Sequence, residues 1–229
     1  MSKFWRQWWR LGGAAGIVFV VVFVVGVALQ SEPPVFDDPV DEIRADWVND
    51  GQQYLVADYI LGLAFALLYV PFIATLSELL GRAEGGPRIW SRVAFIGGLI
   101  IMLWGAWSSV FWGALAFGDF AATASDETLQ TLMALDYYAV MGMPLAFMVF
   151  IGGTTLVIAQ TGIFRRWLVI VGAIESVLAA LAPLAIFSAS SSSFFDVIYL
   201  IAFLLLPIWI LILGILMVRL RAEPAPAMR

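Results

Sequence analysis

The chain has 229 residues, of which 62% are hydrophobic and only 13% charged, and its mean hydropathy is +0.96. A soluble domain is about half apolar and about a quarter charged, so this composition predicts a protein solvated by lipid. The formal net charge is −5, and the sequence has no basic patch of the kind that binds nucleic acid. We therefore expect an all-α fold, a polytopic membrane bundle of six transmembrane helices.

Several membrane chemistries need side chains that this sequence lacks. It contains no Cys and no His, so the usual ligands of haem, iron–sulfur clusters and common zinc sites are missing. Its only lysine is Lys3, ahead of the first apolar run, so no intramembrane amine is available for a retinal Schiff base. We predict no cofactor bound by residues of this chain. The missing ligands argue against metal redox chemistry, and the missing amine argues against a rhodopsin-like role.

The first apolar run extends from Leu11 to Leu29. Residues 1–10 hold three basic residues interleaved with tryptophans, which is typical of an anchor at a cytoplasmic interface. The alternative is a cleaved signal peptide, but its apolar core would be shorter. We expect an uncleaved first span.

An acidic outer loop, residues 31–53, follows the first span, and it is too short to bury a core of its own. Asp38-Pro39 and the acids after them predict the start of a short helix near residues 39–50, ended by Asp50-Gly51. Val40, Ile43 and Trp47 share one face of this helix. It is expected to rest on the outer membrane surface, to cover the bundle, or to be a solvated connector.

Five further apolar runs are long enough to span a bilayer: Tyr54–Leu80, Val93–Phe117, Leu129–Ala159, Trp167–Phe187 and Phe194–Val218. Together with the first they define a transmembrane domain over residues 11–218, and residues 219–229 are expected to be a disordered cytoplasmic tail.

Charge segregates between the two sides if the spans alternate. Eleven of the twelve basic residues then share one side, and Arg44 alone lies opposite, among most of the acids. The positive-inside rule predicts that both termini are cytoplasmic, in a multi-pass protein of the bacterial cytoplasmic (inner) membrane.

Glu175 is the most unusual ionisable residue, because it stands eight residues after Trp167 and so about 12 Å into the bilayer. Headgroups cannot solvate it there, so we expect it to be protonated or paired. The functional interpretation is a proton or cation relay or an anchor for a polar ligand, and the structural one is a hydrogen bond between helices. Prolines at positions 71, 144, 183 and 207 free backbone carbonyls that could form a cavity with it.

Two other groups of residues are candidate sites. Asp58, Asp136 and Asp196 fall near the outer ends of their spans and could converge on a cation, although helix capping and solvation are simpler explanations. In the third span an aromatic face recurs at helical spacing and could stack against a quinone, pigment, carotenoid or lipid, or belong to an aromatic belt or a subunit contact. It comprises Trp104, Trp107, Phe111 and Trp112.

The order of parts resembles a family of six-span bacterial membrane proteins described as a domain of unknown function. The likeness rests on the glycine-bearing first span, the Pro/Asp-rich outer loop, the Leu80-Gly81-Arg82 turn and the Arg165-Arg166-Trp167-Leu168 segment before the fifth span. The family tends to have proline where this chain has Arg165. The resemblance implies the six-span topology and transfers no functional residue.

Three functions are compatible with these features. The first is an accessory or scaffold subunit of a larger membrane complex, in contact with lipids and with other subunits or a hydrophobic cofactor that they hold. The second is a small proton- or ion-coupled transporter or channel that uses Glu175. The third is a membrane-embedded enzyme, which is the least favoured because no nucleophile–base pair is evident in the sequence.

Overall fold

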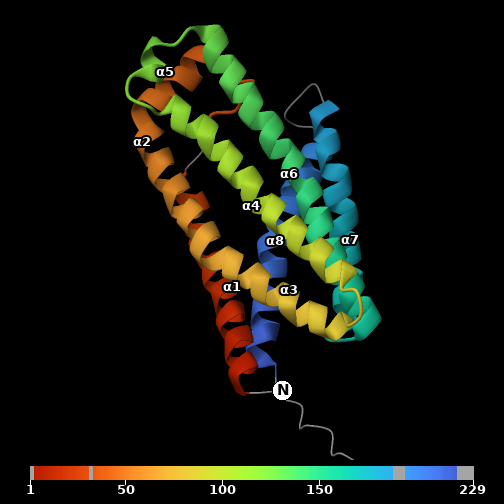
Figure 1. Cartoon of the computed structure of the whole chain (residues 1–229). Helices are drawn as coiled ribbons and strands as arrows, with labels where there is room; N and C mark the ends of the chain where they lie inside the picture. Colours follow the sequence, from red (N-terminus) through yellow and green to blue (C-terminus); the bar gives the residue numbers. More distant parts are fainter. Residues whose placement is uncertain (1–2, 31–32, 188–193, 221–229) are drawn as a thin grey trace, which may run out of the picture.

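The computed structural model describes residues 3–30, 33–187 and 194–220, and the side chains from residue 7 onward within them. Figure 1 shows the helices in chain order. They are α1 (Lys3–Leu29), α2 (Val40–Ala64), the π-helical turn η1 (Phe65–Tyr69), α3 (Val70–Glu84), α4 (Ile89–Leu115), α5 (Phe120–Thr123), α6 (Asp126–Thr161), α7 (Trp167–Leu181), the 3-10 helix η2 (Ala182–Phe187) and α8 (Phe194–Arg219). Residues 221–229 of the predicted tail lie outside the described residues.

Six helices among the described residues are long and apolar enough to cross a membrane, as the sequence predicted. They extend over Gln7–Leu29, Val40–Glu84, Ile89–Leu115, Asp126–Thr161, Trp167–Phe187 and Phe194–Arg219. The second and fourth of them, 45 and 36 residues long, exceed the about 20 residues that a bilayer core requires. Part of each therefore extends beyond the hydrocarbon.

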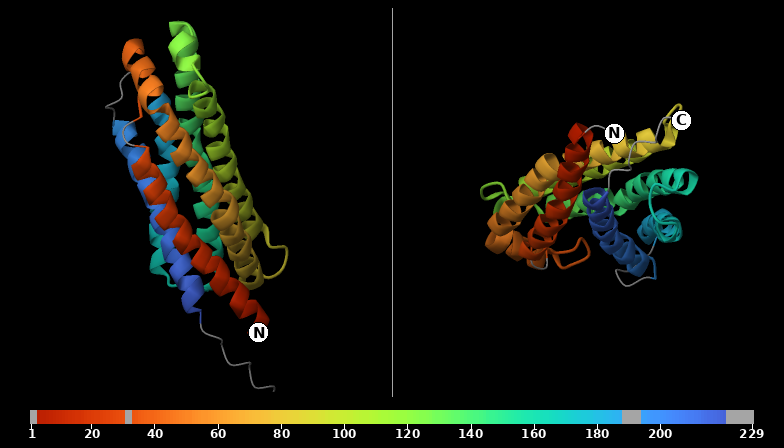
Figure 2. Two further views of the ribbon diagram at one scale, coloured as in Figure 1. Left: turned by 90° about the vertical axis from the view of Figure 1, so that its left-hand side faces the viewer. Right: turned by 90° about the horizontal axis from the view of Figure 1, so that it is seen from below.

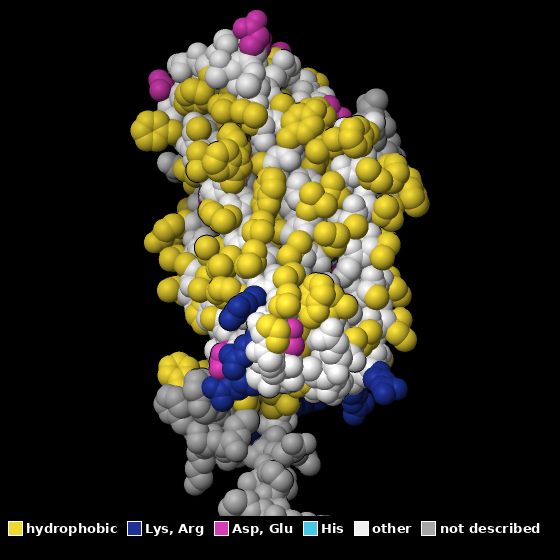
Figure 3. All heavy atoms as spheres, turned by 45° about the vertical axis from the view of Figure 1, so that its right-hand side comes forward, with side chains coloured by type: hydrophobic (Ala, Val, Ile, Leu, Met, Phe, Trp, Pro, Cys, Tyr) yellow, Lys and Arg dark blue, Asp and Glu magenta, His cyan; other side chains and the backbone are white. Residues whose placement is uncertain are grey.

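Charged side chains gather at the two ends of the bundle. Figure 3 shows apolar side chains over its middle, Lys and Arg at one end and Asp and Glu mainly at the other. The basic end contains the start of α1, the α3–α4 and α6–α7 connections and the end of α8 (Figures 1 and 2). We refer to it as the basic end and to the opposite one as the acidic end.

Glycines bring the helix backbones close together. A Cβ atom at Gly13 of α1 would lie 2.6 Å from the carbonyl oxygen of Gly214 on α8, and one at Gly214 would lie 2.8 Å from that of Gly13. The α4–α6 pair relies on Gly97 and Gly153 in the same way. Such contacts let backbones approach without intervening side chains, which is the usual basis of helix packing in lipid. They fix the positions of α1, α4, α6 and α8 around the cavity described below.

The acidic end has a second hydrophobic core, separate from the core of the bundle. Its buried members are Ile43, Trp47, Tyr54, Leu115, Ala121, Leu129 and Met133. They come from α2, α5 and the adjoining ends of α4 and α6. This core therefore combines the helix of the outer loop with three later segments of the chain, from α4, α5 and α6. We call these residues the outer core.

The outer helix differs from its prediction in where it ends. It begins at Val40, and Ile43 and Trp47 of the predicted apolar face are buried, with 0% and 3% exposure. The predicted stop at Asp50-Gly51 was wrong, because the helix continues to Ala64. A Cβ at Gly51 would lie 3.3 Å from that of Ala116, so this glycine lets α2 pack closely against the end of α4.

The four intramembrane prolines have different consequences. Before Pro71 the N–H of Val70 bonds to the carbonyl of Phe65, which forms the π-helical turn. Pro144 and Pro207 lie inside continuous helices, and Pro183 lies in the 3-10 helix that follows α7. π-Helical turns frequently occur at functional sites.

Candidate functional site

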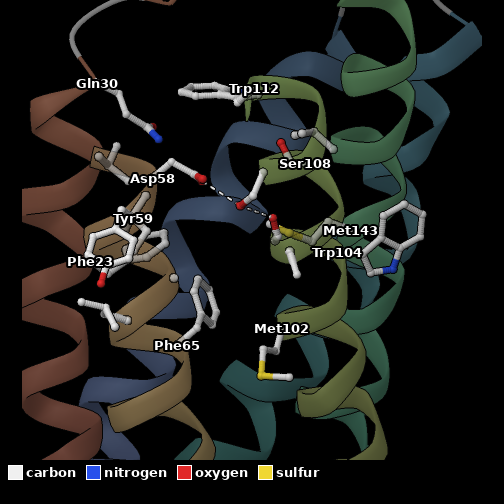
Figure 4. A pocket seen from close by; sticks show the side chains of 18 of the residues that line it. Phe23, Gln30, Asp58, Tyr59, Phe65, Met102, Trp104, Ser108, Trp112 and Met143 are labelled. Atoms are coloured by element: carbon white, nitrogen blue, oxygen red, sulfur yellow. Dashed lines mark hydrogen bonds between the residues drawn. The ribbon is translucent and has the colours of Figure 1, made fainter. Parts of the chain in front are cut away.

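A cavity of about 610 Å³ lies between α1, α2, α4, α6 and α8 (Figure 4). Its walls are mainly apolar, and its polar groups gather toward the acidic end. It is lined by Phe23, Val27, Gln30, Asp58, Tyr59, Leu61, Gly62, Leu63, Phe65, Ala66, Met102, Trp104, Gly105, Ala106, Ser108, Ser109, Trp112, Val140, Met143 and Phe203. Tyr59 and Leu63 are 68% and 42% exposed, so the cavity opens to the outside of the bundle beside α2.

Two adjacent serines of α4 connect two carboxylates that belong to different helices. Ser109 donates to Asp58 Oδ1 of α2 at 2.8 Å, and its hydroxyl also lies 3.0 Å from the carbonyl of Gly105. Ser108 donates to Asp136 Oδ1 of α6 at 2.5 Å. Consecutive helical residues point about 100° apart, so one Ser-Ser pair can reach both neighbouring helices. Asp58 and Asp136 therefore accept from neighbouring residues of the same helix.

Trp112 closes the cavity at its acidic end. Its indole N–H donates to Asp136 Oδ2 at 3.1 Å, and Figure 4 shows its ring above Asp58 and Gln30. On the other side the ring meets Trp47 and Tyr54 of the outer core, with centroid separations of 5.6 and 5.8 Å in edge-on geometry. Trp112 is therefore held by both its hydrogen bond and its aromatic neighbours.

The distance of the polar groups from the basic end can be compared with the thickness of a bilayer. Asp58 precedes Arg82, at the basic end, by 24 residues of almost continuous helix, which corresponds to about 36 Å. The hydrocarbon core of a bilayer is about 30 Å thick. If Arg82 marks one boundary, Asp58 lies at the other, and the apolar part of the cavity faces the adjacent leaflet.

The apolar end of the cavity reaches the centre of the bundle. Phe23, Phe65, Met143 and Phe203 line both the cavity and a smaller void beyond it. That void is bordered by Tyr69, whose buried hydroxyl has no hydrogen-bond partner in the described part of the chain. The site thus has a polar end toward the acidic end of the bundle and an aromatic end toward the centre of the bundle.

The predicted aromatic face of α4 divides among three environments. The Trp104 ring lies on the far side of α4 from Asp58 (Figure 4), where it packs over Gly142 of α6. Trp107 is 59% exposed and meets Phe111 edge-on at 5.9 Å. Neither Trp107 nor Phe111 lines the cavity, so only Trp112 presents its ring to it.

The predicted outer acids also separate. Asp58 and Asp136 meet at the Ser-Ser pair, whereas Asp196, in the first turn of α8, lies near Tyr137 and does not line the cavity. A capping role for Asp196 would involve the residues just before α8, and residues 188–193 lie outside the described part of the chain.

Glu175 lies on α7 away from the cavity. It is 1% exposed, and its Oε1 has no hydrogen-bond partner among the described residues. One turn earlier Gly172 packs against Thr155 of α6 and Trp209 of α8, whose Oγ1 and Nε1 atoms are similarly buried without partners in the described structure. The proline-freed carbonyls of Val140 and Phe203 belong to residues that line the cavity, which does not include Glu175.

Sequence reasoning missed Ser109, Gln30 and Tyr59. Ser109 and Asp58 are 51 positions apart in the chain. The one sequence signal that could have linked them is that both residues lie at a similar distance from the basic end. Among the described residues no group of three or more acidic side chains is arranged to hold a metal ion.

Comparisons with protein-family models, curated proteins and solved structures found no match to this chain.

Proposed function

We propose that this chain binds a membrane amphiphile in the cavity between α1, α2 and α4, as an accessory subunit of a membrane assembly. The observation that carries the proposal is the cavity of about 610 Å³, with carboxylate and hydroxyl groups at one end, aromatic walls at the other and an opening beside Tyr59 and Leu63. Ligand sites typically combine such apolar walls with a few polar groups. An amphiphile in the bilayer has the same distribution of polar and apolar parts.

One glycine of the cavity wall has open space where a side chain would begin. A Cβ at Gly62, which lines it, would meet no atom within 4 Å. The same holds for Gly113 of α4, which is outside the cavity. Gly62→Phe therefore places a ring in the cavity, and Gly113→Phe is a matched control with the same chemical change.

The test is photolabelling in nanodiscs with a long-chain alcohol that carries a diazirine in its alkyl chain. We expect labelled peptides to contain Met102 or Met143, and we expect Gly62→Phe to lower this labelling about tenfold while Gly113→Phe leaves it unchanged. Equal labelling of wild type and Gly62→Phe at those peptides would overturn the proposal.

We further propose that the acidic end faces away from the cytoplasm of a bacterial cell, with the basic end inside. Its support is the separation of Lys and Arg from most of the Asp and Glu along the bundle (Figure 3). Because the chain has no native cysteine, single cysteines report topology directly. A membrane-impermeant maleimide applied to intact cells should label Ala122→Cys and spare Gln160→Cys, and the reverse pattern would refute this orientation.

The accessory role requires partners in the native membrane. Mild-detergent extracts should contain the chain in a species larger than its own 25.1 kDa plus detergent, with further subunits co-purifying. Migration only as a free monomer would count against this part of the proposal and would leave amphiphile binding standing.

A further inference from the structure

We infer that the amphiphile has a single long chain and a cationic head without phosphate, and that Asp58 is its counter-ion. This inference rests on the proposed function and adds the chemical class of the ligand. It would be a long-chain amine or quaternary ammonium compound, with its head beneath Trp112 and its chain directed toward Phe65 and Phe203.

The charge balance of the cavity favours a cation. No Lys or Arg is among the described residues that line it. Asp136 receives two donors, from Ser108 and Trp112, so both of its oxygens are engaged. Asp58 receives one, from a serine hydroxyl that it shares with the Gly105 carbonyl. Its Oδ2 has no donor in the described part of the chain, which leaves a carboxyl oxygen available in a site that has two acidic residues and is lined by no described basic residue.

A phosphate or sulfate head would add a second negative charge beside Asp58, and the two like charges would repel each other. A cationic head would instead neutralise Asp58 and lie near the Trp112 ring (Figure 4). Aromatic faces attract quaternary ammonium groups. The aromatic roof and the carboxylate thus favour the same charge, although they come from different helices.

The volume indicates one chain. At about 30 Å³ for each water-sized group, 610 Å³ holds about 20 such groups. One long alkyl chain with a small head fits this volume, whereas the two chains of a diacyl lipid do not fit in it together.

The experiment compares three photolabels that share one diazirine-bearing chain and differ in the head, which is trimethylammonium, hydroxyl or sulfate. Labelling of the peptides that contain Met102 and Met143 is measured in nanodiscs of neutral lipid. We expect the ammonium probe to label about tenfold more than the alcohol, and the sulfate to label least. Asp58→Asn should reduce the ammonium-to-alcohol ratio to about one, and Asp58→Glu should keep it well above one.

Asp50→Asn is the matched control, since it removes the same charge from an exposed position on the same helix, outside the cavity. It should leave the ratio unchanged. An ammonium-to-alcohol ratio near one in wild type, or a ratio that Asp58→Asn leaves unchanged, would overturn the cationic head even if Gly62→Phe blocks every probe. Labelling that Gly62→Phe does not reduce for any probe would instead refute the proposed function, and the inference with it.

Discussion

Replacing Gly153 of α6 with alanine should weaken the contact between α4 and α6. A Cβ at Gly153 would lie 2.7 Å from the backbone nitrogen of Ala94 and 3.0 Å from its Cα. Ordinary van der Waals contact begins at 3.4 Å, and backbone atoms cannot rotate away as a flexible side chain does. The two helices must therefore separate locally by about 0.7 Å.

The magnitude follows from close packing. Overfilling a packed interior typically costs about 1–3 kcal/mol, and a gap of about 0.5–1 Å already forfeits a quarter to a half of each dispersion contact along the interface. For a chain of this size about 1 kcal/mol shifts the midpoint of thermal unfolding by about 2–4 °C. We expect Gly153→Ala to lower that midpoint by about 2–12 °C.

Gly152 supplies the control from the adjacent position. A Cβ there would lie 3.6 Å from Ser176 Oγ, which is an ordinary contact, and alanine favours a helix over glycine by about 0.5–1 kcal/mol. Gly152→Ala should therefore be neutral or stabilising. Both variants are measured in the same detergent by the loss of monodisperse protein on heating. If Gly153→Ala unfolds at the same temperature as Gly152→Ala, close backbone packing of α4 on α6 is wrong.

Substitutions at three further contacts are measured by the same assay. Ser125 caps α6 through a hydrogen bond to the N–H of Thr128, so Ser125→Ala should cost about 1 kcal/mol and Ser125→Gly only a few tenths; equal losses would contradict the cap. Asp126→Asn should change stability by less than about 1 kcal/mol, because the carboxylate of its ion pair with Arg44 is exposed. Arg44→Ala should cost more, because it also removes a hydrogen bond to a backbone carbonyl of α5. Trp112→Phe keeps most of the ring packing but leaves Asp136 one donor short, and a loss of about 1.5–3 kcal/mol is expected; an unchanged midpoint would remove the indole N–H from the site.

The spans could be predicted from sequence because each depends on a local property, the length of an apolar run. The start of the outer helix was also local, since Pro39 and the acids after it favour a first turn. Its end depended on a distant residue. Gly51 signals a stop in isolation, but opposite Ala116 it permits a close approach between α2 and α4, and the helix continues because packing outweighs propensity.

The candidate site was less accessible to sequence reasoning, because it depends on which helices are neighbours. Depth alone grouped Asp58 with Asp136 and Asp196, but the structure joins the first two through a Ser-Ser pair and places Asp196 elsewhere. Depth also selected Glu175, which is buried as expected. Nothing in one sequence indicates that α7 directs it away from the cavity, since that depends on the packing of α6, α7 and α8.

The outer core and the cavity are mechanically connected through Trp112. The same ring packs on Trp47 and Tyr54, donates to Asp136 and covers the head position beside Asp58. A ligand head that fills this position supports the ring from below, while the outer core holds it from above. Occupancy should therefore stabilise the outer core as well as the bundle, because anything that binds only the folded arrangement stabilises it. In the proposed site, the parts of α2 and α6 beyond the hydrocarbon would have a role in ligand binding, because with the end of α4 they supply the fixed surface against which the cavity is closed.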